Sequence, residues 1–146
     1  MERHRVFAFV GFWCLLLAGS AALCSSQSLL TELKLEHDPG KRSDLALDYA
    51  DEALTNAKAL YAKGEVHKGD ALLDQVTAAL QECATSLNTA HKAKYYKKAE
   101  MKVATLQRRM QGLLEDLSIQ ERGWAEYTSR KIEEIHDKLL DGVMRK

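Results

Sequence analysis

Apolar side chains recur at alternating intervals of three and four residues through most of this 146-residue chain, and no other feature constrains its fold as strongly. Residues three and four apart share one face of an α-helix, and that face must be covered by a neighbouring element. Four successive segments carry such a seam: Leu47, Ala50, Leu54, Ala57 and Tyr61; Val66, Gly69, Leu73, Val76, Leu80, Cys83 and Leu87; Tyr96, Ala99, Val103, Leu106, Met110, Leu113 and Leu117; Ala125, Thr128, Ile132, Ile135 and Leu139. The spacing predicts an all-α protein.

Two features delimit the first of these helices. Asp38 followed by Pro39 is typical of an N-cap with proline at the first helical position, and Ser43-Asp44 offers a second start. Gly64 is expected to end the helix near Lys63, which makes the connection to the second helix very short. Helices joined by so short a connection are antiparallel neighbours.

The remaining boundaries follow from polar residues. Ser86, Asn88 and Thr89 form helices poorly and are expected to end the second helix, whereas Ser118 to Glu121 has the form of a capping box before the fourth. We expect an antiparallel helical bundle of about four helices, built as two helical hairpins with up-down-up-down topology. An elongated pair of hairpins with little shared core is the alternative. Since such seams also serve a dimeric coiled coil, the oligomeric state is left open.

Residues 1–24 are typical of a secretory signal peptide. Arg3 and Arg5 precede an apolar run from Val6 to Leu23, and small or polar residues follow it. Cleavage is expected after Ala22 or after Cys24. The run is also long enough for an uncleaved membrane anchor, and a lipidated Cys24 is a third interpretation. Each interpretation places the remainder outside the cytoplasm, in the periplasm or extracellular space.

The rest of the chain then divides into a lead-in segment, residues 25–38, and a helical bundle domain, residues 39–146. Leucines in the lead-in segment either cap the end of the bundle or form a short helix. With 21 basic and 21 acidic residues the formal net charge is zero, which argues against a nucleic-acid partner. Three cysteines and one proline exclude a disulfide scaffold and a proline-rich linker.

Residues 57–76 resemble a single turn of a tetratricopeptide repeat, through Ala57, Leu60-Tyr61, Gly64-Glu65, Gly69 and Leu73. Only one such unit is visible, whereas these arrays need about three units to bury a continuous core. More broadly, residues 44–87 resemble helical hairpins of uncharacterised exported bacterial proteins, which pair an alanine-rich helix with a leucine-rich one. The resemblance implies a helical hairpin and no activity.

Two places in the sequence carry side chains that could support chemistry. Cys83 lies on an apolar seam, where a thiol behaves as a small hydrophobic group; an interchain disulfide is the alternative. Glu133 and His136 have the spacing of half a di-iron site, but no second such motif exists, and the seam through Ile132 and Ile135 turns Glu133 outward. We therefore expect no catalytic residue, no bound metal and no cofactor, with a metal- or cofactor-binding bundle using His136 as the alternative.

The stretch from His91 to Arg109 is the most unusual in charge, with seven basic residues against Glu100, a net charge of +6. Cations interleaved with aromatic rings are typical of surfaces that hold polyanions. The candidate residues for an anionic partner are Lys92, Lys94, Tyr95, Lys97, Lys98 and Lys102. A solvated helix face, balanced by Asp44, Asp48 and Asp51 on a neighbouring helix, is the competing interpretation.

These features lead to a functional expectation without catalysis. We expect an exported helical protein of the bacterial envelope that acts as an interaction or structural module, with an unknown protein or envelope component as its partner. The further alternative is a binder of anionic envelope surfaces, including the membrane, through residues 91–109.

Overall fold

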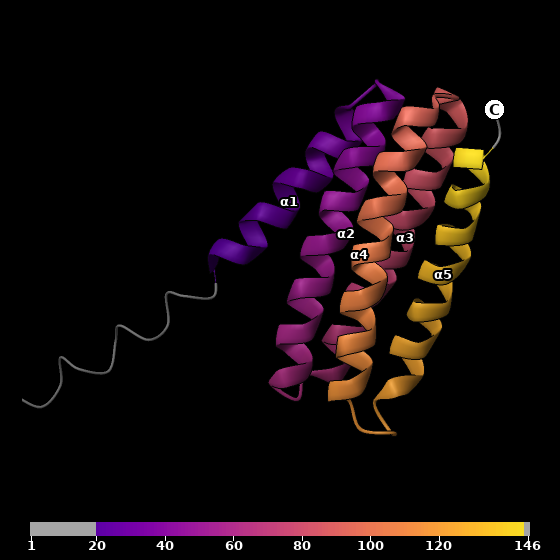
Figure 1. Ribbon diagram of the computed structural model, residues 1–146. Coiled ribbons are helices and arrows are strands. Elements are labelled where there is room, and N and C mark those ends of the chain that lie inside the picture. The colour runs from indigo at the N-terminus through magenta and orange to yellow at the C-terminus, as the bar shows by residue number, and fades with distance from the viewer. Residues whose placement is uncertain (1–19, 145–146) are drawn as a thin grey trace, which may run out of the picture.

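The computed structural model describes residues 20–144, with side chains from residue 28 onward (Figure 1). Within this range the chain forms five helices and no strand: α1 (Ser20–Leu35), α2 (Pro39–Ala62), α3 (Val66–Ala90), α4 (Ala93–Asp116) and α5 (Arg122–Met144). The all-α prediction is confirmed, but the expected number of about four helices is wrong. The lead-in segment forms most of the additional helix, α1. Most of the expected signal segment lies outside the described residues, and Ser20–Cys24 begin α1.

The bundle consists of two antiparallel hairpins, α2–α3 and α4–α5, packed side by side (Figure 1). Helix α2 packs beside α4, and α3 packs beside α5. The direction alternates along the chain as predicted, but α4 packs mainly on α5 and α2 and makes few contacts with α3, although only two residues separate α3 from α4 in sequence. Each hairpin therefore contributes to one shared core, and the elongated alternative does not apply.

Side-chain pairs between helices define the relative directions. Lys98 pairs with Asp44 and Lys102 with Asp48, both 54 residues apart in sequence, so α2 and α4 run parallel. Within the second hairpin, higher residue numbers in α4 are paired with lower residue numbers in α5. His136 contacts Glu100, and Gln111 contacts Ser129, which is the pattern of antiparallel helices.

The seams predicted from the sequence form the core. Every seam position is buried except Val66 and Tyr96, which are half-buried. Leu73, Leu80 and Val103 each have no exposed surface. Burying a leucine or valine side chain stabilises a fold by about 1.5–3 kcal/mol, so the four seams supply the dominant favourable contribution to folding.

Helix α1 packs against α2 alone among the described helices and leans away from the bundle toward its first residues (Figure 1). Leu33 is its one fully buried side chain in the described part, and Leu29 and Leu30 lie against the core. No helix in residues 20–144 is long and apolar enough to cross a membrane.

The first hairpin turn forms as the sequence predicts. Asp38 caps α2 by accepting a hydrogen bond from the Lys41 amide at 2.8 Å, which selects Pro39 and not Ser43 as the start. At the other end Gly64 adopts φ of +75°, and the amide of Glu65 reaches back to the carbonyl of Leu60. This is a Schellman ending, which needs a residue that tolerates the left-handed region.

The predicted break at Ser86, Asn88 and Thr89 is wrong, because α3 continues to Ala90. The hydroxyl of Thr89 donates to the carbonyl of Thr85 at 3.2 Å, and that of Ser86 donates to the side chain of Glu82. These polar groups are satisfied within the helix and therefore do not interrupt it. The helix ends instead at His91, which adopts a left-handed conformation with φ of 50°.

The predicted capping box closes a turn and does not begin a helix. The carboxylate of Glu121 accepts hydrogen bonds from the hydroxyl of Ser118 at 2.6 Å and from its amide at 3.2 Å. Helix α5 starts only after this turn, at Arg122. The contact also lowers the pKa of Glu121, since both bonds favour the ionised carboxylate.

Candidate anion-binding surface

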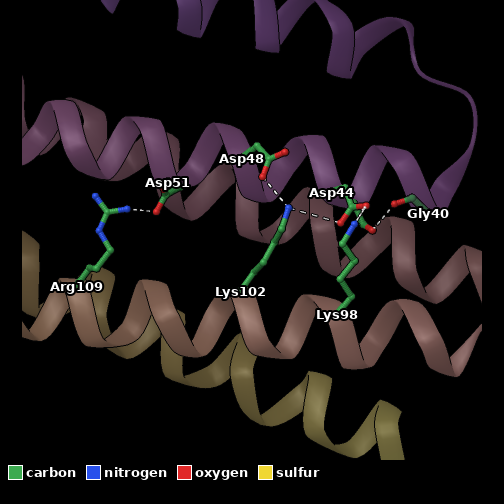
Figure 2. Close-up of polar contacts among 8 residues, drawn as sticks. Gly40, Asp44, Asp48, Asp51, Lys98, Lys102 and Arg109 are labelled. Atoms are coloured by element: carbon green, nitrogen blue, oxygen red, sulfur yellow. Dashed lines mark hydrogen bonds and ion pairs between the residues drawn. The ribbon is translucent and has the colours of Figure 1, made fainter.

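The basic residues predicted to hold an anion occupy the connection before α4 and its first three turns, and two of them face α2. The ammonium of Lys98 lies 2.6 Å from Oδ2 of Asp44 (Figure 2). That of Lys102 lies 2.6 Å from Oδ1 of Asp48 and 3.7 Å from Asp44. The hydrogen bond from Lys98 to Asp44 raises the pKa of this lysine, because the carboxylate favours its charged form.

The same row of ion pairs continues along the two helices. Arg109 pairs with Asp51 (Figure 2) and donates a second hydrogen bond, to the hydroxyl of Thr55 at 2.7 Å. We call this row, from Asp44–Lys98 through Asp48–Lys102 to Asp51–Arg109, the α2–α4 ladder. Two of the predicted anion-binding residues, Lys98 and Lys102, belong to the ladder and already have carboxylate partners.

The other three predicted lysines lie at the start of α4. The Nζ atoms of Lys92 and Lys94 lie 5.8 and 4.9 Å from the centre of the Tyr95 ring, within range of cation–π attraction. Lys97 is exposed and has no hydrogen bond or ion pair within residues 28–144. We call Lys92, Lys94 and Lys97 the basic tip. No acidic residue lies in the first turn of α4 to offset its charge.

The rings of the two tyrosines beside the basic tip each pack closely against a glycine. The ring of Tyr95 lies against Gly40 at the start of α2, where a β-carbon would approach it to 2.5 Å. Tyr96 lies against Gly142 of α5 and donates a hydrogen bond to Asn88 at 3.0 Å. Tyr95, one of the predicted anion-binding residues, is half-buried like Tyr96.

The two residues with the spacing of half a di-iron site do not converge. Glu133 is exposed, as its position off the seam predicts, whereas His136 lies 3.0 Å from Glu100 of α4. Within the described part of the chain, no three His, Cys, Asp or Glu side chains gather closely enough to hold a metal ion.

Cys83 is fully buried on the seam of α3. Burial raises the pKa of its thiol to about 12, and the nearby Asp44 carboxylate acts in the same direction. The thiolate is the reactive form of cysteine, and the raised pKa keeps this thiol protonated. Cys83 therefore serves as a packing group.

Three cross-helix polar contacts have no local signal in the sequence. Nε of Arg42 lies 2.6 Å from a carboxylate oxygen of Glu82. The two groups form an ion pair, but they are not aligned for a hydrogen bond. Tyr49 donates to Gln75 at 2.6 Å. The third is the contact between His136 and Glu100. Only the Tyr61–Asp70 contact, nine residues apart across the Gly64 turn, could have been found from the hairpin alone.

One surface feature was also not singled out from the sequence. Trp124 and Tyr127, one turn apart on α5, are 42% and 39% exposed, and their ring centres lie 5.6 Å apart. The ammonium of Lys131 lies 5.8 Å from the Tyr127 ring. We call Trp124 and Tyr127 the aromatic pair.

Comparison of the sequence with protein-family models and curated proteins, and of the fold with solved structures, found no match.

Proposed function

We propose that this chain is an exported helical module of the bacterial envelope that acts by binding a partner protein and carries out no catalysis. The export part of the proposal rests on the sequence of residues 1–24, in which basic residues precede a long apolar run. The tetratricopeptide-like and exported-hairpin resemblances of residues 44–87 agree with a helical interaction module.

The observation that carries the binding part is the aromatic pair. Trp and Tyr are enriched at the centres of protein interfaces, because each buries a large area at little cost in side-chain entropy. Trp124 and Tyr127 lie on the outer face of α5, while the seam residues of the same helix already fill the core. The aromatic pair is therefore available to a partner without any change in the fold.

Site-specific photocross-linking in the envelope of a bacterial host tests the proposal. A photoreactive amino acid at Tyr127 should cross-link one discrete partner, and Trp124→Ser should abolish that product. The matched control is the same amino acid at Met101, which is 62% exposed on α4. Equal products from both positions, or no loss with Trp124→Ser, would contradict the proposal.

A second candidate function is binding to anionic envelope surfaces, and the basic tip favours it. The α2–α4 ladder uses Lys98 and Lys102, so this function now rests on Lys92, Lys94 and Lys97. Attraction between such exposed cations and a charged surface extends over about 10 Å at 0.1 M salt and is screened beyond that distance. Binding through the basic tip should therefore weaken steeply as salt is added.

Sedimentation with phosphatidylglycerol vesicles tests this second function. Replacing Lys92, Lys94 and Lys97 by Gln should abolish binding at low salt. The control replaces Lys58, Lys63 and Lys68 by Gln at the opposite end of the bundle, which removes the same charge. If both triple variants lose binding equally, the net charge and not the basic tip is responsible.

A further inference from the structure

A groove of about 400 Å³ runs between α1, α2 and α3, on the side of α2 away from the ladder helix α4. It is lined by Leu30 and Leu33 of α1, by Tyr49 of α2, and by Ala78 and Ala79 of α3. The alanines make the groove, because their short side chains leave the space that a larger residue would fill.

Charged groups border this apolar space on one side. Arg42 of α2 and Lys34 of α1 both line the groove. Nε of Arg42 is turned inward, 2.6 Å from Glu82, and its side chain is 38% exposed. The two terminal nitrogens of its guanidinium make no hydrogen bond within the described residues, so they can receive a carboxylate. A guanidinium binds carboxylate through two parallel N–H donors.

We propose that this groove binds a fatty acid, with the acyl chain between α1 and α3 and the carboxylate at Arg42 and Lys34. Ligand sites are typically apolar clefts of about 300–1,000 Å³ with a few polar groups that fix orientation. The volume argues against a helix as the occupant, since a helix with side chains is about 10 Å wide. Because Arg42 and Lys34 supply two positive charges and Glu82 supplies one negative charge, the site favours a ligand with an anionic head group.

Helix α1 forms one wall of the groove and has a single packing partner within residues 20–144. Helix α1 packs on α2 and on no other described helix, and Leu33 is its one fully buried side chain there. An acyl chain that contacts Leu30 and Leu33 would add apolar contacts to α1, so binding should also stabilise this helix against the bundle.

The test uses the chain as it is recovered after export in a bacterial host, with its N-terminus read by mass spectrometry. Dodecanoate below its micellar concentration is titrated into ¹⁵N-labelled protein. The amide resonances of Leu30, Ala78 and Ala79 should shift, whereas that of Trp124 should not. Dodecanol, which has the same chain and no charge, should bind about tenfold more weakly, since one charged contact of this kind changes affinity by about 1.4 kcal/mol.

Variants locate the site. Ala78→Phe places a ring at the exposed wall of the groove and should abolish the shifts, while Ala71→Phe, on an exposed position of the same helix, should not. Arg42→Gln combined with Lys34→Gln should remove the preference for dodecanoate over dodecanol, and Lys41→Gln combined with Lys63→Gln is its charge-matched control. Circular dichroism verifies that each variant folds, with Ala78→Leu as the milder replacement if Ala78→Phe does not.

Three results would overturn the proposal: no shift with dodecanoate, shifts centred on Trp124, or equal affinity for dodecanol and dodecanoate. These outcomes are separate from the cross-linking result at Tyr127, so the groove and the aromatic pair can fail independently.

Discussion

The ammonium of Lys102 lies 2.6 Å from the carboxylate of Asp48, 54 residues earlier in the sequence. The pair belongs to the α2–α4 ladder, which joins the two hairpins along their parallel helices. Because the side chains are partly exposed, each pair is expected to add little to stability, at most about 1 kcal/mol. The ladder contributes register, since the Asp44–Lys98 and Asp48–Lys102 pairs and the hydrogen bond from Arg109 to Thr55 share one offset of 54 residues, while Asp51–Arg109 lies one helical turn away from that offset, at 58.

A double-mutant cycle on this pair measures that contribution. Asp48→Ala and Lys102→Ala should each destabilise the fold by less than about 1 kcal/mol, with a coupling free energy of about 0.2–1 kcal/mol that shrinks in 1 M salt. Urea denaturation at low and high salt gives these values. A coupling that does not depend on salt would show that the contact is not electrostatic in origin.

The seams should dominate stability. Leu80→Ala should lower the free energy of unfolding by about 2–5 kcal/mol, because Leu80 has no exposed surface and its truncation leaves a cavity. Lys97→Ala, on the exposed face of α4, should change it by no more than about 0.5 kcal/mol. Chemical denaturation of both variants checks the assignment, and equal effects would refute it.

The seams also show how much the sequence could predict. Periodicity is a local signal, so it located the core residues of four helices. It could not show that α2 lies beside α4, because that depends on which hairpin faces meet across the bundle. The same limit applies to the site. The sequence offers Asp44, Asp48 and Asp51 as partners of the basic stretch in one of its two interpretations. Which lysine meets which carboxylate follows from a 54-residue register that no local pattern encodes.

Other differences have equally specific causes. Ser86, Asn88 and Thr89 predict a break in the helix, yet the hydroxyl of Thr89 donates to a carbonyl one turn earlier, that of Ser86 donates to Glu82, and the helix continues. The lead-in segment has too few apolar residues to show a seam, so α1 was recognised only as one of two alternatives. The sequence predicts the local contact between Ser118 and Glu121, but it assigns this contact to the start of a helix, whereas the contact closes the turn before α5.

Substitution by alanine should have opposite effects on stability at two glycines that lie in helices. A β-carbon at Gly142 would lie 2.3 Å from the Tyr96 ring, whereas one at Gly112 meets nothing within 4 Å. Gly142→Ala should destabilise the fold by about 1–3 kcal/mol through overpacking, and Gly112→Ala should stabilise it by about 0.5–1 kcal/mol through helix propensity. Thermal unfolding compares the two variants. Stabilisation by both would mean that Tyr96 moves aside freely.

The end of α3 offers a stabilising substitution. His91 adopts φ of 50°, a region that costs residues with a β-carbon about 1–2 kcal/mol. His91→Gly should raise the free energy of unfolding by about 0.5–1 kcal/mol, less than the full cost because glycine also loosens the unfolded chain. Denaturation in urea gives the sign, and a loss of stability would show that the imidazole makes a favourable contact.

Because of Cys83, the stability of the fold should depend on pH in the alkaline range. Its pKa is raised from 9.0 to about 12, so the folded state retains a proton that the unfolded state loses. The stabilisation is present below about pH 9 and is lost as the pH rises toward about 12. Cys83→Ala should remove part of this decline, and the remainder belongs to Tyr49 and Tyr61, whose pKa values burial also raises. An unchanged decline in the variant would show that the thiol does not contribute.

The two-residue link His91–Lys92 has a consequence for how one chain keeps its hairpins together. The backbone reverses there through two residues outside the helical region, because His91 is left-handed and Lys92 is extended. If both residues became helical, α3 and α4 would merge into one continuous rod with a hairpin at each end. The apolar faces of that rod could then be covered only by a second molecule, so the conformation of two residues keeps both hairpins within one chain.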